Sequence, residues 1–146
     1  MWIDADACPR RALEIAGRLA KERGLSLRTV STWRHDLPGE DHLSVDPSPQ
    51  ATDLAILSRM SAGDLVVTQD YGLAALVMAR GGMALSPHGL RFTPENIDSL
   101  LAQRAESARV RRAGRSGRIP GSRLKGPPAR TAEDDRRFRE ALLSLL

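Results

Sequence analysis

Short apolar runs alternate along the chain with longer stretches in which apolar residues recur every three or four positions. The runs at 1–3 and 65–68 are nearly continuous, which is typical of strands that are buried on both faces of a parallel sheet. The stretches at 9–23 and 71–80 have helical spacing, and each is followed by glycine, a common helix terminator. This alternation predicts an α/β fold built from strand, helix, strand units.

The same patterns place the remaining elements and the domain limits. We expect further strands at 25–30, 43–45 and 83–85, and further helices at 51–60, from 94 onward and at 131–146. The resulting prediction is one three-layer α/β/α domain with a mostly parallel sheet over residues 1–108. It is followed by a basic, flexible segment at 109–130, rich in Arg, Gly, Ser and Pro, and by a C-terminal helix at 131–146 that docks on the domain.

Composition narrows the class of protein. A chain of 146 residues suits one domain, and its single cysteine excludes an internal disulfide framework and a cysteine-rich zinc site. Cys8 begins a predicted helix, but no histidine is near it in the sequence, so we interpret it as a buried small side chain. No segment has the ~20 apolar residues that cross a bilayer, and no basic, then apolar, leader is present. The expected location is the cytoplasm, with no membrane partner.

The net charge of +4 conceals an asymmetry between the two parts of the chain. Residues 1–103 carry 13 acidic and 10 basic side chains, whereas residues 104–146 carry 5 acidic and 12 basic ones. Arginine accounts for nearly all of the basic residues, and its planar guanidinium matches phosphate geometry. The acidic part therefore holds the candidate chemistry, and the basic part is either a solvated tail or an attractor of polyanions.

Two carboxylates, Asp4 and Asp6, follow the first apolar run directly. Ligands of parallel α/β sheets bind beyond the carboxyl ends of the strands, where Asp4 would lie. Side chains two positions apart share one side of an extended chain, so the two anions repel each other unless a cation lies between them. Mg²⁺ or Mn²⁺ suits such an oxygen-rich site. The alternative is that Asp6 caps the next helix and Asp4 is a solvated strand end.

A third carboxylate, Asp70, follows the apolar run at 65–68. If this strand neighbours the first, Asp70 and Asp4 face the same crevice, and Thr68 is placed to hydrogen-bond the carboxylates. The alternative for Asp70 is a cap on the helix that begins at Tyr71. Asp64 precedes its strand and is interpreted as a turn residue.

These motifs resemble those of one family. Asp-Ala-Asp-Ala-Cys-Pro at 4–9 and Gly-Asp-Leu-Val-Val-Thr-Gln-Asp at 63–70 are similar to the signature motifs of the YaiI/YqxD family of uncharacterised bacterial proteins. The likeness extends to Leu73-Ala74, Pro87, Gly89, Thr93, Asn96-Ile97, Leu101, Arg104, Gly126-Pro127-Pro128, Asp135-Arg136 and Phe138. That family in turn resembles the PIN-like nucleases, whose carboxylates bind Mg²⁺ or Mn²⁺ at the carboxyl edge of a parallel sheet.

The resemblance implies a PIN-like fold and a set of acidic residues. Asp4 would correspond to the first-strand acid, Asp53 to a helical acid, Asp70 to the acid after the later strand, and Asp6 to an addition of this family. Three places depart from the family pattern: Gln50 replaces an acid, Tyr71-Gly72 stands where a proline is usual, and His88 stands where an arginine is common. These departures bear on the number of metal ions and on the lining of the substrate groove.

The hypothesis is therefore a Mg²⁺- or Mn²⁺-dependent nuclease. Asp4 and Asp70 would be catalytic, and one or two ions would be held by Asp4, Asp6, Asp53 and Asp70. The substrate would be contacted by Thr68, Arg109, Arg111 and Arg112. The expected partner is a nucleic acid, RNA before DNA.

Two other classes of function compete with this hypothesis. A haloacid-dehalogenase-like phosphotransferase would use Asp4 as nucleophile and Asp6 as general acid, but Lys21 and Lys125 are poorly placed for that mechanism. A non-catalytic module would keep the acids for metal binding, RNA binding or structure. The five aromatic residues are scattered, so sequence-specific reading of RNA is not expected.

Overall fold

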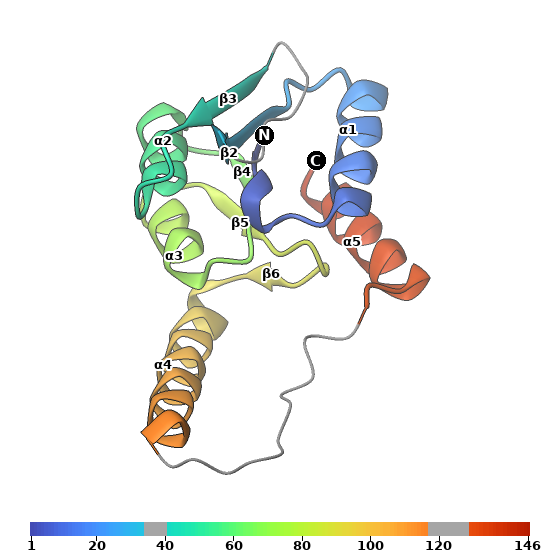
Figure 1. The fold of residues 1–146 in the computed structure, drawn as a ribbon. Coiled ribbons are helices and arrows are strands. Elements are labelled where there is room, and N and C mark those ends of the chain that lie inside the picture. Colours follow the sequence, from blue (N-terminus) through green and yellow to red (C-terminus); the bar gives the residue numbers. More distant parts are fainter. Residues whose placement is uncertain (34–40, 117–128) are drawn as a thin grey trace.

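The computed structural model describes residues 1–33, 41–116 and 129–146, with the backbone alone at 110–116. Six strands form one sheet in the order β3-β2-β1-β4-β5-β6 (Figure 1). The strands are β1 (Trp2–Asp4), β2 (Arg28–Thr32), β3 (His42–Val45), β4 (Leu65–Val67), β5 (Met83–Leu85) and β6 (Arg91–Phe92). Neighbouring strands are parallel except for β6, which is antiparallel to β5.

Helices cover both faces of this sheet. They are α1 (Arg10–Arg23), α2 (Ala51–Arg59), α3 (Tyr71–Ala79), α4 (Pro94–Ser116) and α5 (Ala132–Leu145), and a short 3-10 helix, η1 (Ala5–Ala7), follows β1. Helices α1 and α5 lie on one face, and α2 and α3 lie on the other (Figure 1). The predicted three-layer α/β/α fold with a mostly parallel sheet is confirmed.

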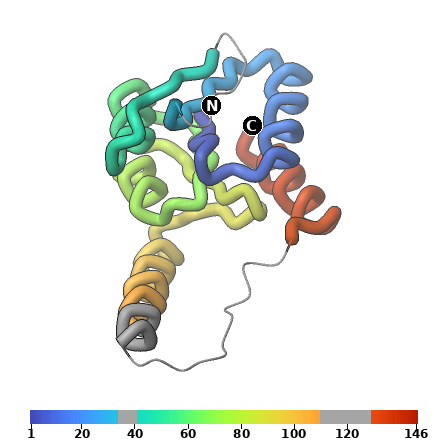
Figure 2. The backbone as a smooth tube through the Cα atoms, viewed as in Figure 1, coloured from blue at the N-terminus to red at the C-terminus, as the bar shows by residue number. Residues whose placement is uncertain are grey.

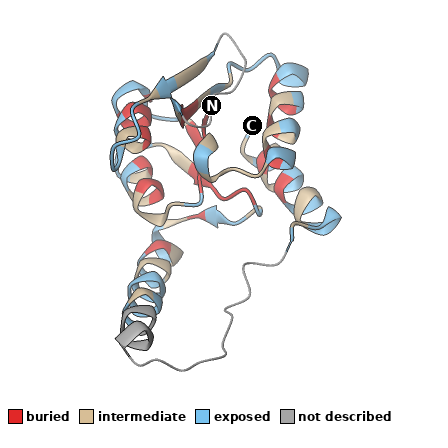
Figure 3. Ribbon diagram, viewed as in Figure 1, coloured by how far each residue is buried: buried red, intermediate tan, exposed pale blue. Residues whose placement is uncertain are grey.

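The central strands contribute side chains to two apolar cores, which explains why their sequences are continuously apolar. Because side chains alternate along a strand, Trp2 packs toward α2 and α3, whereas Ile3 packs toward α1 and α5. Val66 and Val67 divide between the two cores in the same way. Figure 3 shows buried residues along the central strands and on the inward sides of the helices. A strand that is buried on both faces has no room for the polar alternation of a half-exposed strand.

Helix ends follow the expected local chemistry. Gly24 ends α1 with a left-handed backbone, φ 63°, and its N–H bonds to the carbonyls of the last turn. Thr131 begins α5 with a capping box, in which its side chain accepts from Asp134 N at 3.2 Å and Asp134 Oδ2 accepts from Thr131 N at 2.8 Å. These contacts fix the residue at which the C-terminal helix begins.

Helix α5 packs against α1 and the sheet. Phe138 and Leu142 are buried in the core that also contains Ile3. Arg130, just before the helix, donates to Pro87 O at 2.6 Å and lies over the Phe138 ring, with 5.7 Å from Cζ to the ring centroid. The C-terminal segment therefore completes one face of the domain. Figure 2 shows the two chain ends near each other, and Met1 and Leu146 line one small hollow.

Several features differ from the sequence-based outline. The 3-10 helix η1 was not expected, and β2 covers Arg28–Thr32 instead of 25–30. The short strand β6 was not expected, because two residues carry no periodicity; it forms where the turn after β5 closes with a 2.8 Å hydrogen bond from Ser86 N to Leu90 O. Helix α4 continues to Ser116, so the predicted boundary at 108 does not coincide with a helix end. The alanines and arginines there are good helix formers. The rest of the segment predicted to be flexible, 117–128, lies outside the described residues.

Across the three described ranges of the chain, no helix is long and apolar enough to cross a membrane.

Candidate functional site

The strand order creates a switch point between β1 and β4. From β1 the chain proceeds to β2 on one side, whereas from β4 it proceeds to β5 on the other side. Such a reversal leaves a crevice beyond the carboxyl ends of the two strands. Asp4 ends β1, and Asp70 lies three positions after β4. The sheet therefore brings both predicted acids to one edge.

Asp4 is held by a buried threonine from the neighbouring strand end. Its side chain is 5% exposed, and Thr68 Oγ1 donates to Asp4 Oδ2 at 2.8 Å. The same hydroxyl accepts from Asp70 N at 3.0 Å. Thr68 is 0% exposed, so its hydroxyl connects the two acidic segments within the protein. This contact gives Thr68 a supporting role for Asp4, whereas the predicted contact with substrate remains a prediction.

The surroundings of Asp4 disfavour ionisation of its carboxyl group. Burial raises its pKa from 3.8 to about 6, and the charges of Asp53 and Asp6 act in the same direction. The hydrogen bond from Thr68 opposes this rise without cancelling it. Desolvation and like charges both favour the neutral acid. Asp4 is therefore an acid whose ionised form is costly near neutral pH, and a cation beside it would relieve that cost.

Asp53 interacts electrostatically with Asp4 and with Asp70. It lies in the first turn of α2 and is half-buried. Burial raises its pKa, the charge of Asp70 raises it further, and Arg104 lowers it. Because Asp53 also raises the pKa of Asp4, it interacts with the acids that follow both β1 and β4. The three acids form one electrostatic cluster.

Asp70 has two sets of partners. Its Oδ1 accepts from Gly72 N at 2.7 Å and Leu73 N at 3.3 Å, so it caps α3. Arg104 binds both carboxylate oxygens, at 3.0 Å and 3.3 Å. Burial acts to raise the pKa of Asp70, but the Arg104 pair and the helix N–H groups outweigh it and hold the pKa below its usual value. The capping interpretation is confirmed, and it coexists with a position in the acidic cluster.

Arg104 had no assigned role in the sequence analysis. Its partner is 34 positions earlier, and nothing in the local pattern of α4 distinguishes it from the other arginines. Its place among the family motifs was the available signal.

Asp6 has a structural function that the sequence did not reveal. Its carboxylate accepts from Thr32 N, at 2.9 Å and 3.1 Å, and from Thr52 Oγ1 at 3.2 Å. It thereby joins the end of β2 to the start of α2. Pro9 occupies the N-cap of α1, so the alternative that Asp6 caps this helix is wrong.

The predicted metal ligands do not form a closed cage. Within the described part of the chain, no three His, Cys, Asp or Glu side chains are grouped so that they could hold a metal ion. Mg²⁺ commonly uses one or two carboxylates and completes its shell with water and phosphate oxygens. An ion at this edge would therefore take one or two of the carboxylates of Asp4, Asp53 and Asp70 and complete its shell with other oxygens.

Of the three predicted substrate arginines, the side chain of one is described. Arg109 is exposed on α4 and pairs with Glu106, at 3.0 Å from each of two nitrogens. Arg111 and Arg112 belong to the same helix, but their side chains lie outside the described residues. Figure 1 shows this half of α4 extending from the domain.

Cys8, which the sequence predicted to be buried, is half-buried and lies near Asp4. Burial raises the pKa of its thiol to about 12, and the charge of Asp4 adds to the rise. The thiol is therefore protonated at neutral pH and is a poor nucleophile.

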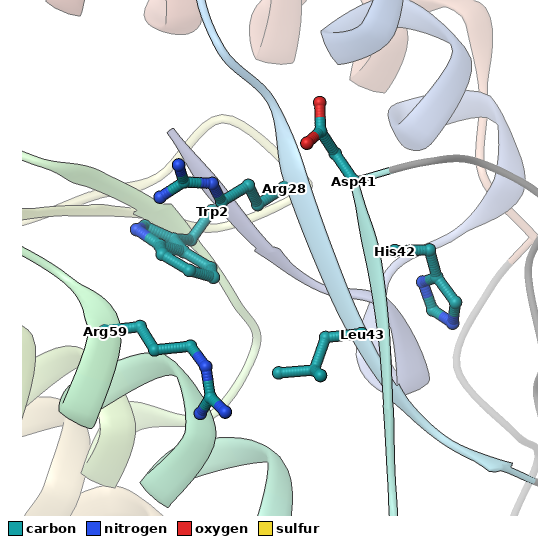
Figure 4. A pocket seen from close by; sticks show the side chains of 6 residues that line it. All are labelled: Trp2, Arg28, Asp41, His42, Leu43 and Arg59. Atoms are coloured by element: carbon teal, nitrogen blue, oxygen red, sulfur yellow. The ribbon is translucent and has the colours of Figure 1, made fainter.

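A second hollow, of about 400 Å³, lies at the opposite, amino edge of the sheet. Its lining comes from the first residues of β1, β2 and β3 and from the end of α2: Trp2, Arg28, Asp41, His42, Leu43 and Arg59 (Figure 4). Arg28 lies over the Trp2 ring, and Trp2 Nε1 donates to Asp64 Oδ2 at 3.1 Å. In Figure 4 the guanidinium groups of Arg28 and Arg59 point in different directions. The charged groups that line this hollow do not point toward one common place (Figure 4). The carboxyl edge therefore remains the candidate site.

Asp64 also accepts from Ser61 N at 2.9 Å, which confirms its interpretation as a turn residue.

Comparison with known proteins identifies relatives over the full length of the chain. The sequence model of a family described as "Uncharacterized BCR, YaiI/YqxD family" matches residues 2–146. A UPF0178 protein of Heliobacterium modesticaldum is 41% identical, over 100% of this chain and 95% of the relative. UPF0178 proteins of Exiguobacterium sibiricum and Alkaliphilus metalliredigens are each 40% identical, over 100% and 99% of this chain and 95% and 89% of the relatives. No solved structure matches the chain.

Proposed function

This chain belongs to the YaiI/YqxD family, which is described as uncharacterised, and from its own side chains we propose that it is a Mg²⁺- or Mn²⁺-dependent nuclease. One observation carries the proposal: Asp4 is buried at the switch point of a parallel sheet, with a pKa raised to about 6 by burial and by neighbouring acids. Carboxylates whose pKa values are raised by burial and by neighbouring charges cluster at functional sites.

A divalent cation is the simplest counter-charge for this cluster. The charge of Asp53 raises the pKa of Asp4, and the charge of Asp70 raises the pKa of Asp53. Hard cations prefer carboxylate and water oxygens. Asp6 remains a proposed ligand, although its hydrogen bonds to Thr32 already engage both of its oxygens. Asp4, Asp53 and Asp70 are therefore the first candidates as ligands.

The proposed substrate is a nucleic acid, RNA before DNA. A bound Mg²⁺ or Mn²⁺ supplies an activated water and stabilises negative charge on the phosphate. The chain's own residues would do the rest. Thr68 would orient Asp4, and Arg104, which pairs with Asp70, would offer a guanidinium to a phosphate oxygen. The exposed arginines of α4 would attract the polyanion with salt-dependent affinity.

A non-catalytic module is the second candidate, and the Arg104–Asp70 ion pair is the observation that favours it. This pair neutralises one acid of the cluster without any metal, as a purely structural network would. The phosphotransferase alternative has less support, because Asp6 is bonded to Thr32 and Thr52 rather than directed to act as a general acid.

The test is cleavage of labelled single- and double-stranded RNA and DNA with Mn²⁺, Mg²⁺ or EDTA. Wild type would be compared with Asp4→Asn and Asp70→Asn, and with Asp98→Asn, an exposed acid on α4, as the matched control. The proposal expects metal-dependent cleavage by wild type and the control, and its loss in the two site variants while they remain folded. Absence of cleavage of every polymer, with or without metal, would reject the nuclease and leave the binding module.

A further inference from the structure

Helix α2, which carries Asp53, begins without the usual side-chain cap. Among the described residues, the N-cap position is held by Gln50, which has a left-handed backbone, φ 65°, and makes no side-chain hydrogen bond to the first turn. Helices usually begin with Ser, Thr, Asp or Asn, whose side chain accepts from an N–H of that turn. The residue at the start of α2 therefore does little to hold the turn that contains Asp53.

A carboxylate from another element holds this turn. Thr52, which is 8% exposed, donates from Oγ1 to Asp6 Oδ2 at 3.2 Å. The same carboxylate accepts from Thr32 N at 2.9 Å and from Thr32 Oγ1 at 3.3 Å, at the end of β2. Asp6 itself belongs to η1, directly after β1. One side chain thus joins the ends of two neighbouring strands to the beginning of α2.

The hydrogen bond of Thr52 limits where Asp53 can lie, because the two residues are adjacent in one helical turn. That turn is closed by a hydrogen bond of 2.9 Å from Leu54 N to Gln50 O. The charge of Asp53 raises the pKa of Asp4, and the charge of Asp70 raises the pKa of Asp53. A displacement of the first turn of α2 would therefore change the position of Asp53 relative to both other acids.

We propose that Asp6 is a positioning residue, which holds the first turn of α2 through Thr52 and thereby keeps Asp53 close to Asp4 and Asp70. This inference rests on the proposed function, since these three acids are the candidate metal ligands. Side chains behind a metal ligand orient it, and their loss typically weakens metal affinity by roughly 10- to 100-fold. The second acid of the Asp-Ala-Asp sequence at 4–6 then has a different role from the first.

Thr52→Val tests the hydrogen bond to Asp6, because it removes one hydroxyl and leaves every charge of the chain in place. In EDTA, amides of residues 51–55 should exchange hydrogen faster in this variant than in wild type. Asp6→Ala should accelerate the same amides, and the double variant should exceed neither single variant by much. Thr52→Ser keeps the hydroxyl and should exchange like wild type. Ser58→Ala removes an exposed hydroxyl from the last turn of α2 and is the matched control.

Calorimetric titration with Mn²⁺ alone measures the consequence for the candidate site. Thr52→Val should bind the ion roughly tenfold more weakly than wild type, whereas Thr52→Ser and Ser58→Ala should bind it like wild type. In an Asp53→Asn background, Thr52→Val should cause no further loss, because its effect passes through the carboxylate that is already missing. A general loss of stability would not disappear in that background.

Equal affinity of wild type and Thr52→Val for Mn²⁺ would overturn the proposal, as would an undiminished loss in the Asp53→Asn background. Failure of wild type to bind Mn²⁺ would instead reject the metal-dependent nuclease. Hydrogen exchange then decides the positioning role by itself: faster exchange of residues 51–55 in both Thr52→Val and Asp6→Ala would support it, and unchanged exchange in either variant would overturn it.

Discussion

Thr68 donates a hydrogen bond of 2.8 Å to Asp4 from the end of the neighbouring strand, although the two residues are 64 positions apart. The contact lies inside the protein, where neither side chain is solvated. It lowers the pKa of Asp4, but burial has the larger effect, and the pKa stays at about 6. The groups around Asp4 therefore do not fully compensate the negative charge of its ionised carboxylate.

Asp4→Asn should stabilise the metal-free protein near neutral pH. The pKa of Asp4 is about 6 in the folded state against 3.8 for the free side chain. Because it is raised, the folded state binds the proton more tightly, so wild-type stability falls as the pH rises between these values. A shift of this size corresponds to roughly 2 to 3 kcal/mol once the group is ionised. Asparagine is uncharged and its oxygen can still accept from Thr68.

Urea denaturation across the pH range measures this effect. In EDTA the variant should exceed wild type near neutral pH, and the difference should shrink toward about pH 4, where Asp4 is protonated in the folded state. A variant that is less stable than wild type near neutral pH would show that Asp4 is already compensated. Asp98→Asn, on the exposed side of α4, serves as the reference.

Thr68→Val should destabilise the domain, since it removes one hydroxyl with two partners. Asp4 Oδ2 loses its donor and Asp70 N loses its acceptor. Unsatisfied buried groups cost roughly 1 to 3 kcal/mol each. The pKa of Asp4 should rise further, so the loss of stability should be greater near neutral pH than at about pH 4. Thr68→Ser keeps the hydroxyl and should recover most of the loss in the same urea titrations; equal losses in Ser and Val variants would contradict this account.

The positions of the acids follow from the sequence, but their partners do not. Asp4 and Asp70 each end an apolar run, and parallel strands bring such ends to one edge. The partners of Asp6 are 26 and 46 positions away, and Arg104 is 34 positions from Asp70. Long-range pairs of this kind depend on helix packing, which local periodicity does not encode. Strand β6 was not predicted because its two residues are too few to show a period.

Arg104→Met should make the acidic cluster more responsive to cations. Arg104 is the counter-charge that holds the pKa of Asp70 low against the effect of burial. A lowered pKa contributes stability that is present above the unfolded value and lost as pH falls through the folded value. Without Arg104 this contribution is reduced and Asp53 and Asp70 repel each other more strongly. Metal-free stability should therefore fall near neutral pH, and the stabilisation by Mn²⁺ should exceed that of wild type.

Thermal unfolding with and without Mn²⁺ measures the difference. Arg109→Met is the matched control, because Arg109 pairs with Glu106 on the same helix rather than with Asp70. An Mn²⁺-induced shift of Tm that is the same in wild type and Arg104→Met would mean that Arg104 and the cation do not share a site. An Arg109→Met protein that behaves like Arg104→Met would point to a general charge effect.

Gly89 and Gly63 allow backbone strain to be separated from helix docking. Both have φ 86°, where a side chain costs about 1 to 2 kcal/mol. A Cβ at Gly63 meets nothing within 4 Å, whereas a Cβ at Gly89 would lie 2.8 Å from the backbone carbon and oxygen of Arg137 and 2.9 Å from Phe138 N. These are atoms of α5, which cannot move aside as a flexible side chain could.

Gly63→Ala should therefore lower the free energy of unfolding by about 1 to 2 kcal/mol, the cost of the backbone conformation alone. Gly89→Ala should lower it clearly more, because α5 must shift and Phe138 loses packing in the core shared with α1. Hydrogen exchange locates the change: amides of α5 should exchange faster in Gly89→Ala and not in Gly63→Ala. Equal losses in the two variants, with α5 equally protected, would show that the turn after β5 does not hold the C-terminal helix in place.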